Sequence, residues 1–294
     1  MKLKDIQEIF HKELDEIYGK DEVNSFFFML TEAYFGLERF ALALDPEIVI
    51  TKEQETPLFS ALSELKLQKP IQHILGKAHF FGLEFTVNEH TLIPRPETEE
   101  LVQWILDDIK TANSPTKTYR ILDIGTGSGC IPIALKKNIP NAVISAIDIS
   151  EKALEVANEN AITNEVQIQF VQADVLVLDD LNLFEEENIR FDIIVSNPPY
   201  VRNLEKEAMH KNVLDFEPDS ALFVDDHDPL IFYDKIAHLA KAHLQSNGSL
   251  YFEINQYLGK EMFDLLKKKE FKNIELRKDI FGVDRMMKCV KREK

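Results

Sequence analysis

A glycine-rich turn between a short apolar strand and a helix constrains the fold of this chain more than any other feature. In the segment RILDIGTGSGCIPIALKK (120–137), Gly125, Gly127 and Gly129 separate an Ile/Leu run from a helical pattern. A strand, a turn and a helix in this order predict an α/β domain with parallel strands. A dinucleotide-binding turn has the spacing G-x-G-x-x-G, but here the third glycine comes one position earlier and Cys130 takes its place. The spacing therefore argues against a dinucleotide oxidoreductase.

Two further apolar runs follow the turn, and each ends in an aspartate. The run AVISAIDIS ends at Asp148, and VQIQFVQADVL ends at Asp174 and Val175. A carboxylate in the position of Asp148 accepts both hydroxyls of a ribose in nucleotide-binding α/β folds. We expect Asp174 to accept from an adenine amino group and Val175 to pack against the ring. Either aspartate alone could be an ordinary loop residue, but their regular strand–helix order favours a nucleoside site.

The fourth run of the series stops abruptly at Asn197-Pro198-Pro199-Tyr200. Neither proline can donate to a sheet ladder, so the strand must end here, at the edge where open α/β sheets hold their ligands. The side-chain oxygen of Asn197 and the carbonyl of Pro198 are two fixed acceptors that can hold a planar NH2 group. Tyr200 would stack on the flat group that carries it. The alternative is a plain turn with an exposed tyrosine, since Asn-Pro commonly opens turns.

The first 76 residues are predicted to be helical. Leu3, Ile6, Phe10, Leu14 and Ile17 recur at helical spacing, with charged residues on the other face. A later segment, PLFSALSELKLQ (57–68), begins with a proline that suits a first helical turn. A bundle of short helices is the expected result, with a role as a scaffold or in docking a macromolecular partner.

Between the bundle and the glycine turn the hydrophobic period changes. HFFGLEFTV (79–87) predicts a β-hairpin that turns near Gly82. The acids that begin the next helix, Glu97 among them, suit the helix macrodipole, while Arg95 on the preceding loop is a candidate site residue. We expect a helical bundle at 1–76, a β-hairpin linker at 77–97 and an α/β domain at 98–294. The strands after Gly248 and Gly282 predict an antiparallel hairpin at one edge of its sheet.

Composition excludes several classes of function. The net charge of −17 and the absence of a dense Lys/Arg stripe argue against nucleic-acid binding. The N-terminus has no secretory pattern and no apolar run is long enough to cross a membrane, which predicts a cytoplasmic protein. Cys130 and Cys289 lack disulfide or metal spacing and are predicted to be buried thiols. The acids around His227 are more typical of a solvated loop than of a metal site, so no metal is expected.

A nucleoside cofactor bound over a glycine loop of this spacing suggests S-adenosylmethionine, with S-adenosylhomocysteine as the product. The loop has the pattern D-x-G-x-G-x-G of nucleoside-dependent methyltransferases. The expected cofactor-binding residues are Gly125, Thr126, Gly127, Ser128, Gly129, Asp148, Asp174, Val175 and Asn197. The expected catalytic residues are Asn197, Pro198 and Tyr200, and the expected substrate-binding residues are Asn197, Pro198, Pro199 and Tyr200.

The chain resembles the HemK/PrmC family of protein-glutamine N5-methyltransferases, which modify class I peptide-chain release factors. The resemblance covers nearly the whole chain, through PIQHILG, HFFGLEF, LIPRPETEELV, DIGTGSGCI, VSNPPYV, FEPDSAL and KDIFGVDR. NPPY alone is shared with adenine and cytosine amino-methyltransferases, whereas PRPETE combined with a helical N-terminal domain is more specific. The chain departs from the family pattern near Asp228-Pro229 and at Asn255, outside the motifs that carry chemistry.

The resemblance implies a Rossmann-like class I methyltransferase domain, a mainly parallel sheet with an antiparallel edge hairpin, preceded by a helical bundle. It implies that Asn197 to Tyr200 hold the glutamine of a Gly-Gly-Gln loop and that the bundle docks the release factor, tuning translation termination. Two alternatives stay open at this point. One is a nucleic-acid amino-methyltransferase that flips a base onto the same residues, and the other is a non-catalytic binding module that keeps the fold.

Overall fold

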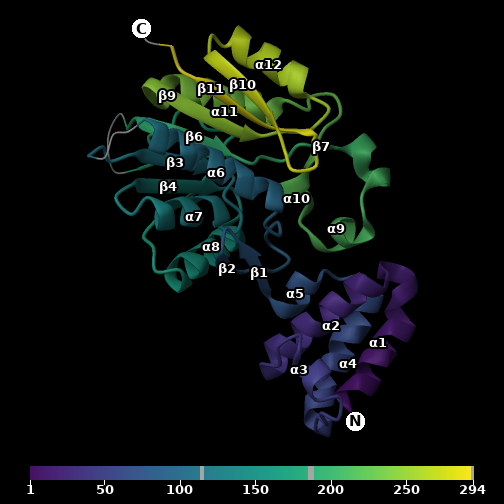
Figure 1. The fold of residues 1–294 in the computed structure, drawn as a ribbon. Coiled ribbons are helices and arrows are strands. Elements are labelled where there is room, and N and C mark those ends of the chain that lie inside the picture. Colours follow the sequence, from purple (N-terminus) through teal and green to yellow (C-terminus); the bar gives the residue numbers. More distant parts are fainter. Residues whose placement is uncertain (113–115, 185–188, 293–294) are drawn as a thin grey trace. The chain divides into compact units, whose positions relative to one another are not determined.

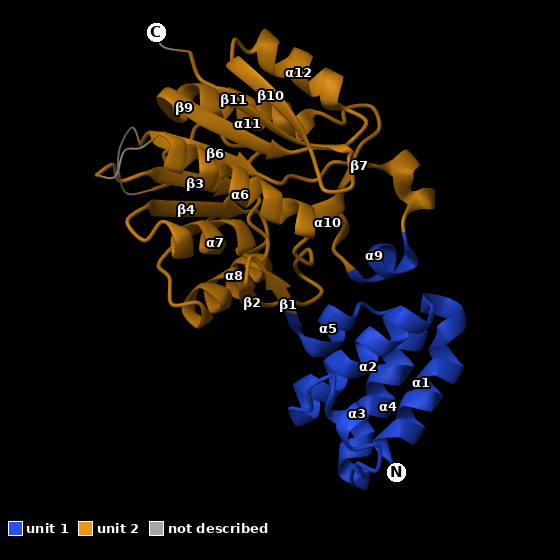
Figure 2. Ribbon diagram, in the orientation of Figure 1, with its two compact units in different colours: residues 1–77, 210–216 blue, residues 78–209, 217–294 orange. Residues whose placement is uncertain are grey.

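The computed structural model describes residues 1–112, 116–184 and 189–292 and divides into two compact units. Unit 1 comprises residues 1–77 and 210–216, and unit 2 comprises residues 78–209 and 217–294 (Figures 1 and 2). No helix within the described residues has the length and apolar character needed to cross a membrane.

Unit 1 is helical. Its helices are α1 (Leu3–Tyr18), α2 (Lys20–Phe35), α3 (Ala41–Leu44), α4 (Lys52–Lys66), α5 (Ile71–Leu75) and α9 (Lys211–Phe216). The predicted stripe of α1 is buried except for Ile17, which lies in the last turn and is 43% exposed. Phe10 meets Phe27 of α2 edge to face with ring centroids 5.2 Å apart. The expected helix start at Pro57 was wrong, because α4 begins one turn earlier. Thr51 and Gln54 form a capping box there, which satisfies two backbone N–H groups and starts the helix at Lys52.

Unit 2 contains a seven-stranded sheet in the described part of the chain, in the order β10-β11-β9-β6-β3-β4-β5. The strands are β3 (Arg120–Ile124), β4 (Val143–Asp148), β5 (Gln169–Gln172), β6 (Phe191–Ser196), β9 (Leu244–Glu253), β10 (Lys272–Lys278) and β11 (Asp284–Val290). Strands β5, β4, β3, β6 and β9 are parallel, and β11 and β10 continue the sheet antiparallel. The predicted α/β fold with an antiparallel edge hairpin is confirmed.

Helices cover both faces of this sheet (Figure 1). The helices of unit 2 are α6 (Pro96–Thr111), α7 (Cys130–Asn138), α8 (Glu151–Thr163), α10 (Asp219–Leu222), α11 (Ile231–His243) and α12 (Gly259–Lys268), with a 3-10 turn at Asn203–Ala208. Consecutive strand residues such as Ile193 and Ile194 point to opposite faces of the sheet. Ile193 joins the core under α6 and α7, and Ile194 joins the core under α11 and α12. The parallel strands are therefore buried on both sides, as their continuous apolar runs predict.

Two smaller β elements complete unit 2. The hairpin predicted around Gly82 is present as β1 (Lys77–Phe80) and β2 (Leu83–Thr86), and Gly82 has φ +73°. The short strands β7 (Val201–Arg202) and β8 (Phe223–Val224) pair in parallel. Both cysteines are free and buried, as expected, and burial raises the pKa of Cys130 to about 12. Neither thiol is therefore activated at neutral pH.

Candidate active site

The parallel register brings four strand ends together. One row of paired residues crosses four neighbouring strands through Ile147, Ile124, Ser196 and Phe252. The next residue along each strand is Asp148, Gly125, Asn197 and Glu253, in the spatial order β4, β3, β6 and β9. Two carboxylates, a glycine turn and the Asn-Pro-Pro segment thus lie at one edge of the sheet. This is the carboxyl edge, where α/β sheets bind ligands.

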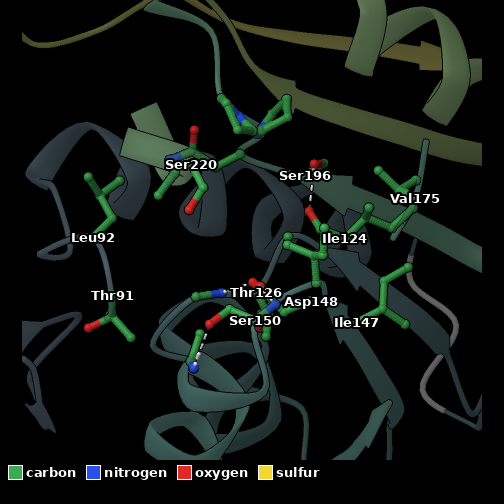
Figure 3. Close-up of a pocket in the computed structure, with 18 of the residues that line it drawn as sticks. Thr91, Leu92, Ile124, Thr126, Ile147, Asp148, Ser150, Val175, Ser196 and Ser220 are labelled. Carbon is green, nitrogen blue, oxygen red and sulfur yellow. Dashed lines mark hydrogen bonds between the residues drawn. The ribbon is translucent and has the colours of Figure 1, made fainter. Parts of the chain in front are cut away.

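A cavity of about 330 Å³ opens at this edge. Of the predicted site residues, ten line it: Gly125, Thr126, Gly127, Ser128, Asp148, Asp174, Val175, Asn197, Pro198 and Pro199. Figure 3 shows Thr126, Asp148 and Ser150 grouped together, with Val175 and Ile147 on one side and Thr91 and Leu92 across from them. The size and the mixed apolar and polar lining suit a small organic ligand.

The glycine turn leaves open space beside the cavity. Gly125 and Gly127 have φ values of +76° and +54°, and a Cβ built on either glycine meets no other atom within 4 Å. Gly129 differs, because a Cβ there would lie 3.1 Å from side-chain carbons of Ala157 and Ile133. The first two glycines therefore keep backbone accessible to a ligand, and the third allows close packing of α7 against α8. Gly129 is not among the described residues that line the cavity.

Asp148 is fixed by the backbone around it. Its Oδ2 accepts from the N–H of Gly127 at 2.8 Å, and its Oδ1 accepts from the N–H of Ser150 at 2.9 Å. Burial raises the pKa of Asp148, although these backbone hydrogen bonds oppose the shift. A carboxylate has about four lone-pair positions, so Asp148 can accept further hydrogen bonds from a diol.

Other polar groups of the cavity point to the same kind of ligand. Asp174 accepts through Oδ1 from the N–H of Leu176 at 2.9 Å, which holds the loop after β5. The hydroxyl of Thr126 is buried beside the carboxylate of Asp123 and lowers the pKa of that carboxyl. The open glycine turn and the fixed carboxylate of Asp148 fit a polar nucleoside such as S-adenosylmethionine.

Comparison with known proteins agrees with this geometry. Residues 12–76 match the family described as PrmC N-terminal domain, and residues 103–216 match Methyltransferase small domain. A "Release factor glutamine methyltransferase" of Flavobacterium psychrophilum is 54% identical over 98% of this chain and 99% of its own length. This chain belongs to the release factor glutamine methyltransferase family.

Two further comparisons place the family match in context. The release factor glutamine methyltransferase of Bacteroides thetaiotaomicron is 41% identical over 93% of this chain and 95% of its own length. Among solved structures, the hMettl16 catalytic domain in complex with MAT2A 3'UTR hairpin 1 has a TM-score of 0.56 at 16% identity. It covers 81% of this chain and 83% of that chain. The structural likeness shows a shared methyltransferase fold.

In this family member, a hydrogen-bonded chain through residues of α6 and β9 holds the side chain of Asn197 in place. Its Nδ2 donates to Thr98 Oγ1 at 3.3 Å, and Thr98 Oγ1 in turn donates to Glu253 Oε2 at 2.6 Å. The Tyr200 hydroxyl donates to the other oxygen of Glu253 at 3.0 Å. Tyr200 is not among the described residues that line the cavity, and its ring packs against the core under α11. Stacking of Tyr200 on a substrate stays a prediction.

Sequence reasoning missed several residues that build this edge. Thr98 lies among the acids of the first turn of α6, and Glu253 is the last residue of β9. The signal for Glu253 was present, since an acid at the end of a buried strand had already marked Asp148. Leu92 and Ser220 also line the cavity. Both lie in motifs quoted for the family resemblance, LIPRPETEELV and FEPDSAL, but no role had been given to them.

Proposed function

We propose that this protein transfers a methyl group from S-adenosylmethionine to the side-chain amide nitrogen (N5) of the glutamine in the Gly-Gly-Gln loop of class I peptide-chain release factors. The observation that carries the proposal is the position of Asn197-Pro198 beside the glycine turn and Asp148, in a chain of this family. We expect the reaction to occur in the cytoplasm.

The cofactor is assigned to the part of the cavity formed by Gly125, Gly127, Asp148, Asp174 and Val175. Asp148 would accept the ribose hydroxyls, and Asp174 and Val175 would hold the adenine. The N-terminus of α7 has no side-chain cap, and its positive dipole end favours a carboxylate. When bound, S-adenosylmethionine supplies an electrophilic methyl group on a sulfonium that leaves as neutral S-adenosylhomocysteine.

Asn197 and Pro198 would hold the substrate amide. An amide nitrogen is a poor nucleophile because its lone pair is delocalised into the carbonyl group. Two N–H donors directed at Asn197 Oδ1 and at the Pro198 carbonyl favour the pyramidal, electron-rich nitrogen of the transition state. The same contacts orient the nitrogen toward the methyl group, and orientation lowers the barrier further. The nitrogen loses a proton to water after the N–C bond forms, so no general base is required before transfer.

Unit 1 is proposed to dock the release factor. Its helices match the PrmC N-terminal domain over residues 12–76. A separate docking unit would explain how a small amide in a protein loop is selected.

The proposal is tested with S-adenosylmethionine labelled in the methyl group. The purified protein is incubated with a class I release factor and, in parallel, with the same factor carrying Gln→Ala in its Gly-Gly-Gln loop. Label is expected on the first and not on the second, and mass spectrometry should place one methyl group on the glutamine side chain. Label on DNA or RNA and on neither factor would instead support the nucleic-acid alternative.

A further inference from the structure

A buried hydrogen-bonded chain lies behind the candidate catalytic amide. It runs from Asn197 Nδ2 to Thr98 Oγ1, from Thr98 to Glu253 Oε2, and from Glu253 Oε1 to the hydroxyl of Tyr200. Thr98 is 2% exposed and Glu253 is 1% exposed, so water does not compete for the bond between them. The chain joins α6, β9 and the Asn-Pro-Pro-Tyr segment, which are far apart in sequence.

The chemistry of Glu253 sets the direction of every bond in this chain. An ionised carboxylate only accepts, so the hydroxyl protons of both Thr98 and Tyr200 must point toward it. The hydroxyl of Thr98 then has only lone pairs left for Asn197. The NH2 group of Asn197 must face Thr98, because the opposite orientation would bring Oδ1 against a lone pair. The Asn197 oxygen is thereby left free for a substrate.

We propose that Thr98 and Glu253 are positioning residues that hold the Asn197 amide in the one orientation able to accept a hydrogen bond from the substrate NH2 group. This inference rests on the proposed function, because it assigns a donor amide as the substrate. Hydrogen bonds in a chain polarise one another. The carboxylate therefore also makes Asn197 Oδ1 a stronger acceptor at the point where charge develops.

The Tyr200 hydroxyl, which donates to Glu253, is itself contacted by Arg285. Arg285 Nη1 donates to the Tyr200 oxygen at 3.4 Å, and Arg285 Nε donates to Asp279 Oδ2 at 3.0 Å. Burial raises the pKa of Glu253 above its ordinary value, and the hydrogen bonds from Thr98 and Tyr200 and the charge of Arg285 offset only part of that rise. The proposed orientation needs the ionised carboxylate, and these two hydroxyl donors and the cation are the groups that favour it.

The test compares Thr98→Val, which keeps the shape and removes the hydroxyl, with Thr98→Ser, which keeps the hydroxyl. We expect kcat for release factor methylation to fall about 10- to 100-fold in Thr98→Val, a range that outer partners of functional groups typically show. The KM for the release factor and the affinity for S-adenosylmethionine should change little, since substrate binding surfaces are intact. Thr98→Ser should restore kcat to near the wild-type value.

Glu253→Gln gives a second, independent variant. The new NH2 group makes one of the two hydroxyls face a donor. In the orientation that places this NH2 group on Thr98, the Thr98 proton turns away and Asn197 loses its fixed orientation. We expect a lower kcat with a similar thermal midpoint. A nuclear magnetic resonance spectrum of the ¹⁵N-labelled protein reads the same contact without turnover. The Asn197 side-chain amide signal, assigned by its loss in Asn197→Ala, should move in Thr98→Val and stay near its position in Thr98→Ser.

Equal kcat values for Thr98→Val and Thr98→Ser would overturn the inference while leaving the proposed function intact. An increase in KM with kcat unchanged would also overturn it, because that pattern indicates lost uniform binding. If the wild-type protein labelled no release factor, the proposed function would fail and the inference with it.

Discussion

The guanidinium of Arg95 lies 2.6 Å from the carboxylate of Glu217, which comes from a segment 122 residues later in the chain. The Glu217 side chain is 1% exposed, and its second oxygen accepts from the N–H of Ile93 at 3.1 Å. Arg95 itself lines the cavity and immediately precedes α6, which carries Thr98. The pair therefore joins the loop before α6 to the segment before α10, on one wall of the site.

This pair predicts a measurable coupling in stability. Removing Arg95 by Arg95→Ala leaves a buried carboxylate with one backbone partner, which should cost about 1–3 kcal/mol given that Arg95 is partly exposed. Glu217→Ala leaves the Ile93 N–H unpaired and should cost a similar amount. Because the two losses share one interaction, the double variant should be more stable than additivity predicts by about 0.5–3 kcal/mol. Urea unfolding of the four proteins measures this coupling, and strict additivity would contradict the structural role of the pair.

A second prediction separates chemistry from cofactor binding. Asn197→Ala should leave the affinity for S-adenosylmethionine within a few fold. It should raise the barrier to methyl transfer by about 2–4 kcal/mol, as the loss of one preorganised polar contact typically does. Asp148→Ala should instead weaken cofactor binding, because its carboxylate is fixed by Gly127 and Ser150 and faces the cavity. Calorimetry gives the affinities and single-turnover kinetics gives the barrier. Near-normal turnover by Asn197→Ala would contradict the assigned role.

The sequence was sufficient to predict the residues that each strand end contributes by itself. The glycine turn, Asp148 and Asn197 follow apolar runs, so their place at the carboxyl edge needed only the βα pattern. Glu253 also ends an apolar run, but Thr98 could not be assigned in this way, because its role depends on a contact between residues 155 positions apart. That contact requires α6 to pack beside the end of β9, which apolar patterning does not specify.

Tyr200 also shows how little a local motif says about the neighbours of a side chain. Its aromatic ring next to two prolines suggests a stacking surface, and that role stays a prediction. The structure adds that its hydroxyl donates to Glu253 and that its partly buried ring packs against the core under α11. A local motif shows which groups are available at a strand end. It does not show which neighbour satisfies them, since that depends on residues brought in by β9 and β11.

A third prediction concerns pH. Asp123 is completely buried in β3, and burial raises the pKa of its carboxyl to about 7, with the charge of Asp148 adding to the shift. Hydrogen bonds from the Thr126 hydroxyl and the backbone N–H of Ile124 oppose this shift only in part. Between about pH 4 and pH 7 the folded chain therefore binds a proton that the unfolded chain has lost. The contribution of Asp123 to stability should fall as pH rises through this window and become constant above it.

The variant Asp123→Asn isolates this contribution, because the amide cannot ionise. Its stability relative to the wild type should increase by about 3 kcal/mol between pH 5 and pH 8, at 1.36 kcal/mol for each pH unit up to the folded pKa. Urea unfolding at several pH values measures the difference. Titration of groups that do not interact with Asp123 cancels between the two proteins. A difference that does not vary with pH would show that Asp123 is already ionised at pH 5.

The last prediction compares two glycines of the same turn. Gly127 and Gly129 both have positive φ, so an alanine at either position should cost about 1–2 kcal/mol in backbone strain. At Gly129 the new methyl group would also lie 3.1 Å from carbons of Ala157 and Ile133, and overpacking of this kind adds about 1–3 kcal/mol. Gly129→Ala should therefore be less stable than Gly127→Ala by about that added amount.

At Gly127 the methyl group meets open space beside the cavity, so this variant should lose affinity for S-adenosylmethionine instead. Urea unfolding and calorimetry on both variants test the distinction. Wild-type affinity in Gly127→Ala would mean that the cofactor does not lie against this part of the turn.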